Sequence, residues 1–246
     1  MILLFTDFGG TASYVGQMHA VLLRAAPDVP VVDLTHHAPA FDPRRAAYLL
    51  AAEAWIARPG DVVVAVVDPG VGTDRAPLAL DADGVWLVGP DNGLLGLVAR
   101  RCRHPRWYRI DWCPARSSAT FHGRDLFAPV AARLARGEDV ALTATVPAVA
   151  AADWPDDLDE VVFVDDYGNA MTGRRAATLD AAVVLVANGH PFRPARTFAD
   201  DAAAHGMWYA NAIGLAELAV REGAAARRFG LALGTAVSLA APPATA

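Results

Sequence analysis

The sequence lacks paired cysteines and long apolar runs. Its 246 residues include only two cysteines, Cys102 and Cys113, which form neither a CxxC motif nor a zinc site. We interpret both as free thiols in a reducing cytoplasm. Gly, Pro, Asp or Arg interrupts every apolar run before the roughly 20 residues that a membrane span needs. The opening segment MILLFTDFGG is also too short and too uncharged for a signal peptide, so we expect a cytoplasmic protein without a membrane partner.

The sequence also lacks an excess of positive charge, with 21 Lys and Arg residues against 27 Asp and Glu residues. The formal net charge of -6 gives no electrostatic footprint for nucleic acid. The Arg-rich residues 100–109 are the exception, and we interpret them as a solvated helix end. A hydrophobic content of 54% against 20% charged residues is enough to bury a core in one large or two smaller domains.

The hydrophobic pattern changes character near the middle of the chain. Before that point strands and helices alternate, in the order ILLFTDF, helix 14–26, VPVVDLTH, helix 43–57 and VVVAVVD. This alternation predicts an α/β N-terminal domain with a largely parallel sheet, over residues 1–152. After the linker-like AAADWPDDLDE the chain shows short strands without long helices, which predicts a β-rich domain over residues 159–246, a sandwich or a small β-barrel.

Four strands of the first domain end in polar residues. These residues are Asp7, then Asp33 with His36, then Asp68 with Arg75, and then Asp91 with Asn92. Because the carboxyl ends of parallel strands open into the crevice where ligands bind, one binding site would explain all four clusters together. The alternative is a set of separate turns, since the Asp-Pro-Gly of VVVAVVDPGVGTDR favours a turn by itself. No Gly-Lys-Ser/Thr follows its glycines and no helix opens directly after them, which argues against a P-loop.

A metal site is a further possibility at this edge. Asp33, His36 and His37 are residue types that bind metals, but adjacent strand residues point to opposite faces of a sheet. We therefore predict no metal at these residues.

Six motifs occur in one order along the chain: TDFGG with YVGQM, DLTHHAP, DPGVGTDR, GPDNGLL, SATFHGRDLFAP and VDDYGN. In this order they resemble the S-adenosylmethionine hydroxide adenosyltransferase family, whose members hydrolyse S-adenosylmethionine to adenosine and L-methionine and are related to the fluorinases and chlorinases. The resemblance covers nearly the whole chain. It implies a C-terminal β-barrel and a homotrimer in which each active site lies between the N-terminal domain of one subunit and the C-terminal domain of its neighbour.

The resemblance also assigns a role to particular residues. It implies that Asp68, Arg75 and His122 form the catalytic triad that prepares the attacking water. The resemblance implies S-adenosylmethionine as the substrate, with no cofactor or metal required. Because its sulfonium leaves as a neutral thioether, the displacement at the ribose C5′ needs no general acid. The alternative for His122 alone is a satisfied buried histidine. Arg124 and Asp125 are predicted to form a structural pair.

Six further residues are predicted to bind substrate: Asp7, Phe8, Asp165, Asp166, Asn169 and Asn211. By resemblance Asp7 accepts hydrogen bonds from the ribose hydroxyls, while Asp165 or Asp166 holds the methionine ammonium and Asn169 the adenine edge. Turns and an N-cap are the alternatives for these residues, and the sequence does not decide between the two adjacent aspartates.

One departure from the family pattern concerns the methionine carboxylate. The family usually has a serine after Asn211, but Ala212 stands here, so a backbone N–H would have to replace the hydroxyl. Two other functions stay open: a halide-dependent adenosyl transferase, and a non-catalytic binder of adenosine or S-adenosylmethionine. In the halogenating relatives a tyrosine stands in place of Asp68, and a binder is expected to lack a member of the triad.

Overall fold

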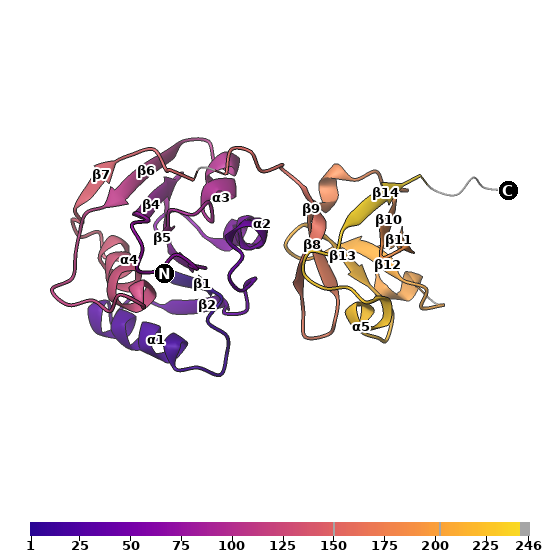
Figure 1. The fold of residues 1–246 in the computed structure, drawn as a ribbon, viewed down its shortest axis with the longest axis horizontal. Coiled ribbons are helices and arrows are strands. Elements are labelled where there is room, and N and C mark those ends of the chain that lie inside the picture. The colour runs from indigo at the N-terminus through magenta and orange to yellow at the C-terminus, as the bar shows by residue number, and fades with distance from the viewer. Residues whose placement is uncertain (150, 202, 242–246) are drawn as a thin grey trace. The chain divides into compact units, whose positions relative to one another are not determined.

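The computed structural model describes residues 1–149, 151–201 and 203–241, which divide into two compact units, Met1–Trp154 and Pro155–Ala246. Each unit is built around one seven-stranded sheet (Figure 1). Among the described residues no helix is both long and apolar enough to cross a membrane.

The sheet of the first unit is parallel in one half and antiparallel in the other. Its strand order is β2-β1-β3-β5-β4-β6-β7. The parallel strands are β1 (Ile2–Thr6), β2 (Val31–Thr35), β3 (Val62–Val66) and β5 (Val85–Pro90). The antiparallel strands are β4 (Pro77–Ala82), β6 (Pro105–Ile110) and β7 (Leu142–Ala144). The predicted parallel sheet thus describes the half that carries the polar strand ends.

Helices cover both faces of this sheet. Figure 1 shows α1 (Tyr14–Ala25) and α4 (Ala128–Ala135) on one side, and α2 (Pro43–Glu53) and α3 (Gly96–Arg101) on the other. Asp42 begins α2, because its side chain accepts a hydrogen bond from the backbone N–H of Arg45 at 3.0 Å. The helix predicted over 43–57 ends as a 3₁₀ turn (Ala54–Ile56).

The sheet of the second unit is nearly closed and barrel-like. Its order is β14-β10-β11-β12-β13-β9-β8. The strands are β8 (Leu158–Val164), β9 (Ala170–Arg175), β10 (Val184–Ala187), β11 (His190–Pro194), β12 (Met207–Ala210), β13 (Leu215–Ala219) and β14 (Val237–Ala240). The two edges approach each other where Val161 donates to the carbonyl of Thr235 and accepts from Gly234, both at 2.9 Å. The helix α5 (Ala225–Phe229) follows β13.

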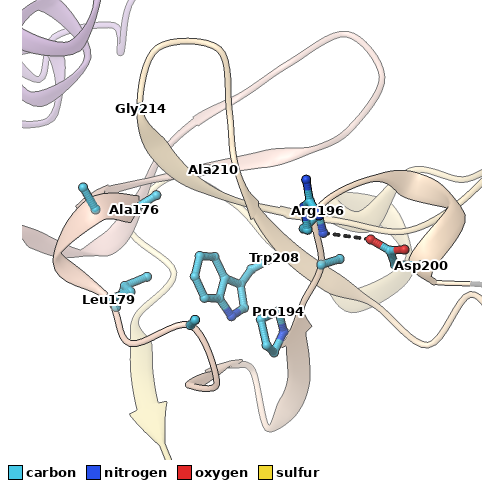
Figure 2. A pocket seen from close by; sticks show the side chains of 11 residues that line it. Ala176, Leu179, Pro194, Arg196, Asp200, Trp208, Ala210 and Gly214 are labelled. Atoms are coloured by element: carbon cyan, nitrogen blue, oxygen red, sulfur yellow. Dashed lines mark hydrogen bonds between the residues drawn. The ribbon is translucent and has the colours of Figure 1, made fainter.

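This second unit contains an apolar cavity of about 640 Å³ beside Trp208 (Figure 2). Leu179 and Pro194 lie near the indole ring, whose N–H donates to the carbonyl of Val183 at 2.8 Å. None of the substrate-binding residues predicted from the sequence lines this cavity.

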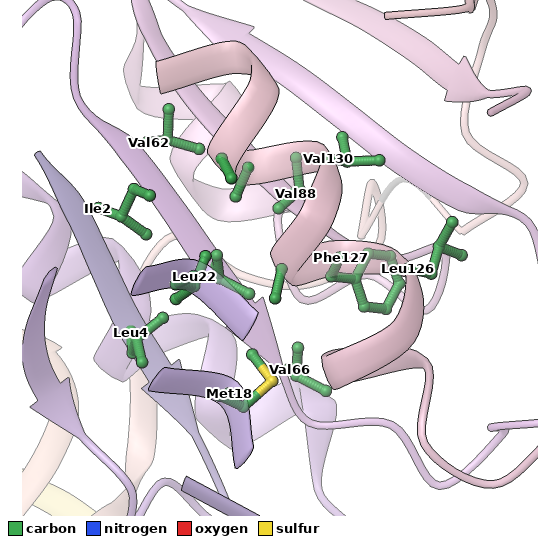
Figure 3. Packing of buried hydrophobic residues seen from close by; sticks show 14 of the residues in the cluster. Ile2, Leu4, Met18, Leu22, Val62, Val66, Val88, Leu126, Phe127 and Val130 are labelled. Carbon is green, nitrogen blue, oxygen red and sulfur yellow. The ribbon is translucent and has the colours of Figure 1, made fainter. Parts of the chain in front are cut away.

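A buried cluster in the first unit fixes the strands beneath the polar edge (Figure 3). Ile2 and Leu4 of β1, and Val62, Val64 and Val66 of β3, pack against residues of α1 and α4. Side chains alternate along a strand, so Asp68 continues the row of Val62, Val64 and Val66 beyond the end of β3. The alternation therefore directs this aspartate toward the face of the sheet that α1 and α4 cover.

Candidate active site

The loop after β3 folds back upon its own beginning. The backbone N–H of Val71 donates to the carbonyl of Asp68 at 3.2 Å, and the Thr73 N–H donates to that of Gly70 at 3.1 Å. Gly72 has a φ of +80°, and a Cβ there would lie 2.7 Å from the carbonyl oxygen of Ala119. Glycine is thus required for the conformation and for the close approach of the two segments. The loop therefore forms a turn, and this turn brings Arg75 back into contact with Asp68.

Arg75 joins Asp68 to His122. Its Nε lies 2.9 and 3.0 Å from the two carboxylate oxygens of Asp68, and its Nη2 also contacts this carboxylate. The same Nη2 lies 2.9 Å from Nδ1 of His122. The side chains of Arg75 and Asp68 are only 9% and 5% exposed. Arg75 therefore contacts both of the other residues that the resemblance implies as catalytic, and its ion pair with Asp68 is buried.

The contact with Arg75 determines the tautomer of His122. A guanidinium can only donate, so Nδ1 must accept and the proton of the neutral ring must be on Nε2. Burial lowers the pKa of His122, and the positive charge of Arg75 lowers it further, against the opposing effect of Asp68 and Asp125. His122 is accordingly a neutral imidazole that offers an Nε2–H donor.

A cavity of about 110 Å³ lies beside this cluster. Ten residues line it: Asp7, Phe8, Phe41, Val66, Asp68, Val71, Thr120, Phe121, His122 and Gly123. Arg75 is not one of them, and its guanidinium lies over the Phe127 ring, 5.4 Å from the centroid. Asp68 and His122 thus face the cavity, while Arg75 holds both from behind. The buried Nη1 of Arg75 has no hydrogen-bond partner among the described residues.

Asp7 and Phe41 also line the cavity and contact each other. The Phe41 N–H donates to the Asp7 carboxylate at 3.2 Å. Burial raises the pKa of Asp7, against the lowering effect of this hydrogen bond. Phe41 has a φ of +59° and is 80% exposed, which is unusual for a large apolar residue. Sequence reasoning missed Phe41, because nothing in PAFDP distinguishes it from an ordinary residue before a helix.

Phe8 and Gly123 determine how narrow the cavity is. Phe8 packs on Phe121, with ring centroids 5.5 Å apart. Gly123 begins a single π-helical turn, η2 (Gly123–Phe127), before α4, and such turns are frequent at functional sites. A Cβ on Gly123 would lie 3.0 Å from Cζ of Phe8, so a larger residue would displace this ring.

Arg124 and Asp125 form the predicted structural pair. The Arg124 Nε lies 2.6 Å from Oδ1 of Asp125, and its Nη1 lies 2.6 Å from the side-chain oxygen of Gln17 in α1. The Asp125 carboxylate also accepts from the N–H of Ser118 at 2.7 Å. The pair fastens η2 to α1 and takes no part in the cavity wall.

The other polar strand ends do not reach this cavity. The Asp91 carboxylate accepts from the N–H groups of Ala148 and Val149, and the Asn92 side chain donates to the carbonyl of Val67. Asp33 and His36 lie beside His19 of α1 instead. The expectation of one site for all four strand ends therefore holds only for Asp7 and Asp68.

In the second unit, Asp165 closes the VDDYGN turn. Its carboxylate accepts from the backbone N–H of Asn169 at 2.8 Å and from the side-chain amide of Asn169 at 3.1 Å. Asp165 and Asn169 line a cavity of about 680 Å³, whereas Asp166 is absent from its lining. Asp165 therefore stabilises the turn and also lines a cavity, so the two interpretations of this residue do not exclude each other.

Asn211 organises the turn between β12 and β13. Its side-chain oxygen accepts from Ile213 and Leu215, and its amide donates to Glu217 at 2.8 Å. Glu217 also accepts from the hydroxyl of Tyr209, and burial raises the pKa of this carboxyl. Glu217 and Tyr209 line the same cavity as Asp165, but Asn211 does not. Sequence reasoning missed Glu217, whose place in an apolar strand gave no signal.

Fold and site together define a two-domain protein in which an α/β unit carries a buried Asp-Arg-His cluster at the carboxyl edge of its sheet. Family models for the SAM hydroxide adenosyltransferase N-terminal domain and C-terminal domain match residues 2–144 and 159–238. The chain therefore belongs to the SAM hydroxide adenosyltransferase family.

Known relatives agree with this membership. The chain is 42% identical to an (R)-S-adenosyl-L-methionine hydrolase of Salinispora arenicola, over 90% of each chain. It is 40% identical to one of Thermus thermophilus, over 95% of this chain and 97% of the relative. A fluorinase of Actinopolyspora mzabensis is more distant, at 25% identity over 75% of this chain. A crystal structure of an uncharacterized conserved protein from Thermotoga maritima has a TM-score of 0.83 and 29% identity, covering 98% of this chain and all of that one.

Proposed function

We propose that this protein hydrolyses S-adenosyl-L-methionine with water at the ribose C5′, giving adenosine and L-methionine. The observation that carries the proposal is the pairing of Asp68 and neutral His122 on the wall of one small cavity, both held by Arg75. The names of the relatives that share most of this chain support the same reaction.

We assign tasks in preparing the water to Asp68 and His122, with Arg75 holding both side chains. The Asp68 carboxylate has lone pairs left beyond those that Arg75 engages, and these accept a hydrogen bond from the water. The Nε2–H of His122 is the donor left for the water oxygen, since Nδ1 is used by Arg75. A water fixed between an acceptor and a donor directs one lone pair at C5′, which lowers the entropic part of the barrier.

The bonds and charges balance without a cofactor or a metal. The water oxygen bonds to C5′ while the C5′–S bond breaks, and its electron pair stays on sulfur. The sulfonium becomes the neutral thioether of methionine, and the proton lost by the water passes by way of Asp68 to solvent. Because charge is neutralised at the reacting atoms, a small cavity with few waters favours this step over bulk solvent.

Substrate binding requires groups from both units. We assign Asp7 to the ribose hydroxyls as a hydrogen-bond acceptor, and Phe8 and Phe41 offer apolar surface around the cavity. Asp165 and Asn169 are the groups we assign to the methionine ammonium and the adenine edge, with a backbone N–H near Ala212 for the methionine carboxylate. We propose a homotrimer in which a neighbouring subunit supplies the second unit of each site.

The test follows the oxygen atom. The purified protein is incubated with S-adenosylmethionine in H₂¹⁸O, and adenosine and methionine are separated by chromatography and weighed by mass spectrometry. We expect ¹⁸O in the 5′-hydroxyl of adenosine, with none in methionine. Adenosine without the label, or no adenosine at all, would contradict the proposal.

A halide-dependent transfer is the second candidate, because a fluorinase is among the relatives. The Asp68 carboxylate on the cavity wall would repel a halide anion, and Gly123 offers no hydroxyl to bind one. The same incubation with added chloride should therefore give no 5′-chloro-5′-deoxyadenosine. A purely binding role is the third candidate, and accumulation of adenosine over many turnovers would exclude it.

A further inference from the structure

A cluster of metal-binding side chains lies apart from the proposed active site. It consists of His19 in α1, Asp33 in β2 and His36 just after β2, and the three candidate ligand atoms all lie within 4.8 Å of one another. We propose that these residues form a binding site for a divalent first-row transition-metal ion such as Zn²⁺. None of the three lines the cavity that contains Asp68 and His122.

The distances fit a metal site with little rearrangement. Nε2 of His19 lies 2.8 Å from Oδ1 of Asp33, and Nε2 of His36 lies 3.1 Å from the same oxygen. Zinc bonds of about 2.0 Å in a tetrahedron place neighbouring ligand atoms roughly 3.3 Å apart. The two distances to Asp33 differ from this value by about 0.5 Å or less, and the third pair, His19 and His36, lies within 4.8 Å, so small side-chain movements would admit an ion between the three residues.

The surroundings of His36 orient it as a ligand. Its Nδ1 lies 2.7 Å from the hydroxyl of Thr6, a residue that is fully buried at the end of β1. Metal-binding histidines commonly have such a partner on the second ring nitrogen, which fixes the tautomer and the ring. When Nδ1 donates to Thr6, Nε2 presents its lone pair toward the cluster.

The other nitrogen of His36 points to a missing ligand. Nε2 is buried and has no hydrogen-bond partner among the described residues, although Asp33 is only 3.1 Å away. In the tautomer that donates from Nδ1 to Thr6, the Nε2 lone pair faces a carboxylate oxygen of Asp33, which is an unfavourable pair of acceptors, and a cation between them would satisfy both.

The donor set selects the kind of ion. Two imidazole nitrogens and one carboxylate oxygen suit Zn²⁺, Co²⁺ or Ni²⁺, whereas Mg²⁺ and Ca²⁺ prefer oxygen ligands alone. The Asp33 side chain is 41% exposed, and that of His19 is 28% exposed, so an ion can enter from solvent. Water can then fill the remaining coordination positions.

Such a site would have a structural effect on the active-site region. It would tie α1 to the edge strand β2, and through the contact of His36 with Thr6 it would also brace the turn that carries Asp7 and Phe8. The argument against a metal at DLTHHAP concerned the pair His36 and His37. It does not apply to His19, which the fold brings in from another element.

The test is titration of the chelator-stripped full-length protein with Zn²⁺, by calorimetry and by thermal unfolding. The starting protein carries Cys113→Ser, because an exposed thiol could bind zinc by itself. We expect one bound ion per chain and a rise in the unfolding midpoint of about 5 °C at an excess of ~100 times Kd. Co²⁺ should bind at the same site, with d–d absorption that reports its geometry.

Substitutions separate this site from adventitious binding. His19→Gln and Asp33→Asn, which keep the approximate size of each side chain, should each weaken Zn²⁺ binding at least about tenfold and abolish the rise in the midpoint. His37→Gln is the matched control and should change neither measurement. Equal affinity in His19→Gln and the starting protein, or an equal loss in His37→Gln, would overturn the proposal. If His19→Gln fails to fold, the Asp33→Asn titration decides.

Discussion

Arg75 donates from Nη2 to Nδ1 of His122 across 2.9 Å, and this contact leaves the proton of the neutral ring on Nε2. The same guanidinium engages both carboxylate oxygens of Asp68. One buried cation therefore fixes the orientation of an acceptor and of a donor on the wall of the cavity. We assign Arg75 a positioning role, because it does not line the cavity.

The first prediction concerns pH. Burial, and then the charge of Arg75, lower the pKa of His122 from its ordinary value of 6.5. Activity should therefore persist as pH falls through 6.5 and decline only when the folded-state histidine takes up a proton, which breaks its contact with Arg75. The pH profile of kcat, measured with and without His122→Gln, checks this. A decline centred at or above the ordinary histidine value would contradict it.

Stability should follow the same group with a defined sign. In the window between the lowered pKa and the ordinary value, the unfolded chain binds more protons at His122 than the folded protein does. The free energy of unfolding should therefore fall as pH decreases through this window and level off below the lowered pKa. In His122→Gln this part of the pH dependence of urea unfolding should disappear.

A second prediction tests the role of Asp68. Asp68→Asn keeps the size of the side chain but removes the charge that receives the water proton, so kcat should fall by about 10²–10⁴-fold. Adenosine affinity should stay within roughly tenfold, because the group acts on the water. Asp125→Asn is the control, since it also removes a carboxylate paired with an arginine, and it should keep most of its activity. Equal losses in both variants would indicate general destabilisation.

The sequence predicts the elements with a clear pattern of apolar residues better than the strands whose conformation depends on pairing with neighbouring strands. The predicted strands β1 and β3 are apolar runs that are buried along their whole length. β2 is only partly buried, but its apolar run ends in the polar residues that also predicted it. β4 was missed, since PLALDA was not separated from the turn chemistry around it. The antiparallel half arises because Asp83 and Gly84, with φ of +54° and +89°, make a tight hairpin between β4 and β5.

In the second unit, the largely apolar segment WYANAIGLAELAV has the pattern of one strand but forms two. Asn211 accepts from two backbone N–H groups and so turns the chain between β12 and β13. The sequences of β9 and β11 do not identify them as strands, because AMTGRR and HPFRP contain few apolar residues. These strands depend on their neighbours in the nearly closed sheet for their conformation.

Motifs indicated the triad of the candidate site, but not the groups around it. Asp68 and Arg75 are joined by one loop, so their contact follows from the turn residues between them. Phe41, Glu217 and His19 belong to three different sites, and in each case only the tertiary fold brings the residue to its partners. No local pattern distinguishes such residues.

A third prediction concerns Gly72. Alanine there would combine strain at a φ of +80° with a Cβ 2.7 Å from the carbonyl of Ala119, and should cost roughly 3 kcal/mol of stability. Because this loop returns Arg75 to Asp68, kcat should fall as well. Gly137→Ala has a similar φ of +68° but no atom within 4 Å of the new Cβ, so it should cost only about 1 kcal/mol and leave kcat unchanged. Similar values for both variants would show that the contact with Ala119 is unimportant.

A fourth prediction concerns chelation. The proposed chemistry uses a carboxylate, an imidazole and a guanidinium, so protein stripped with EDTA should keep its kcat even where zinc raises its unfolding midpoint. Adding Zn²⁺ back should change stability without changing turnover. A loss of kcat that a divalent ion restores would instead place the metal in the reaction.

The last prediction tests whether neighbouring subunits share each site. Asp68→Asn inactivates the first unit, and Asp165→Asn should weaken the second, because it removes the charge assigned to the methionine ammonium. If each site combines the first unit of one subunit with the second unit of another, co-expression of the two variants would create some sites with both halves intact. Random assembly would make about a quarter of the sites intact, with a KM for S-adenosylmethionine like that of the original protein. If each site lies within one chain, the mixed protein should show only the average of the activities of the two variants. Gel filtration of the mixture, with the two chains carrying different tags, would confirm that the subunits had exchanged.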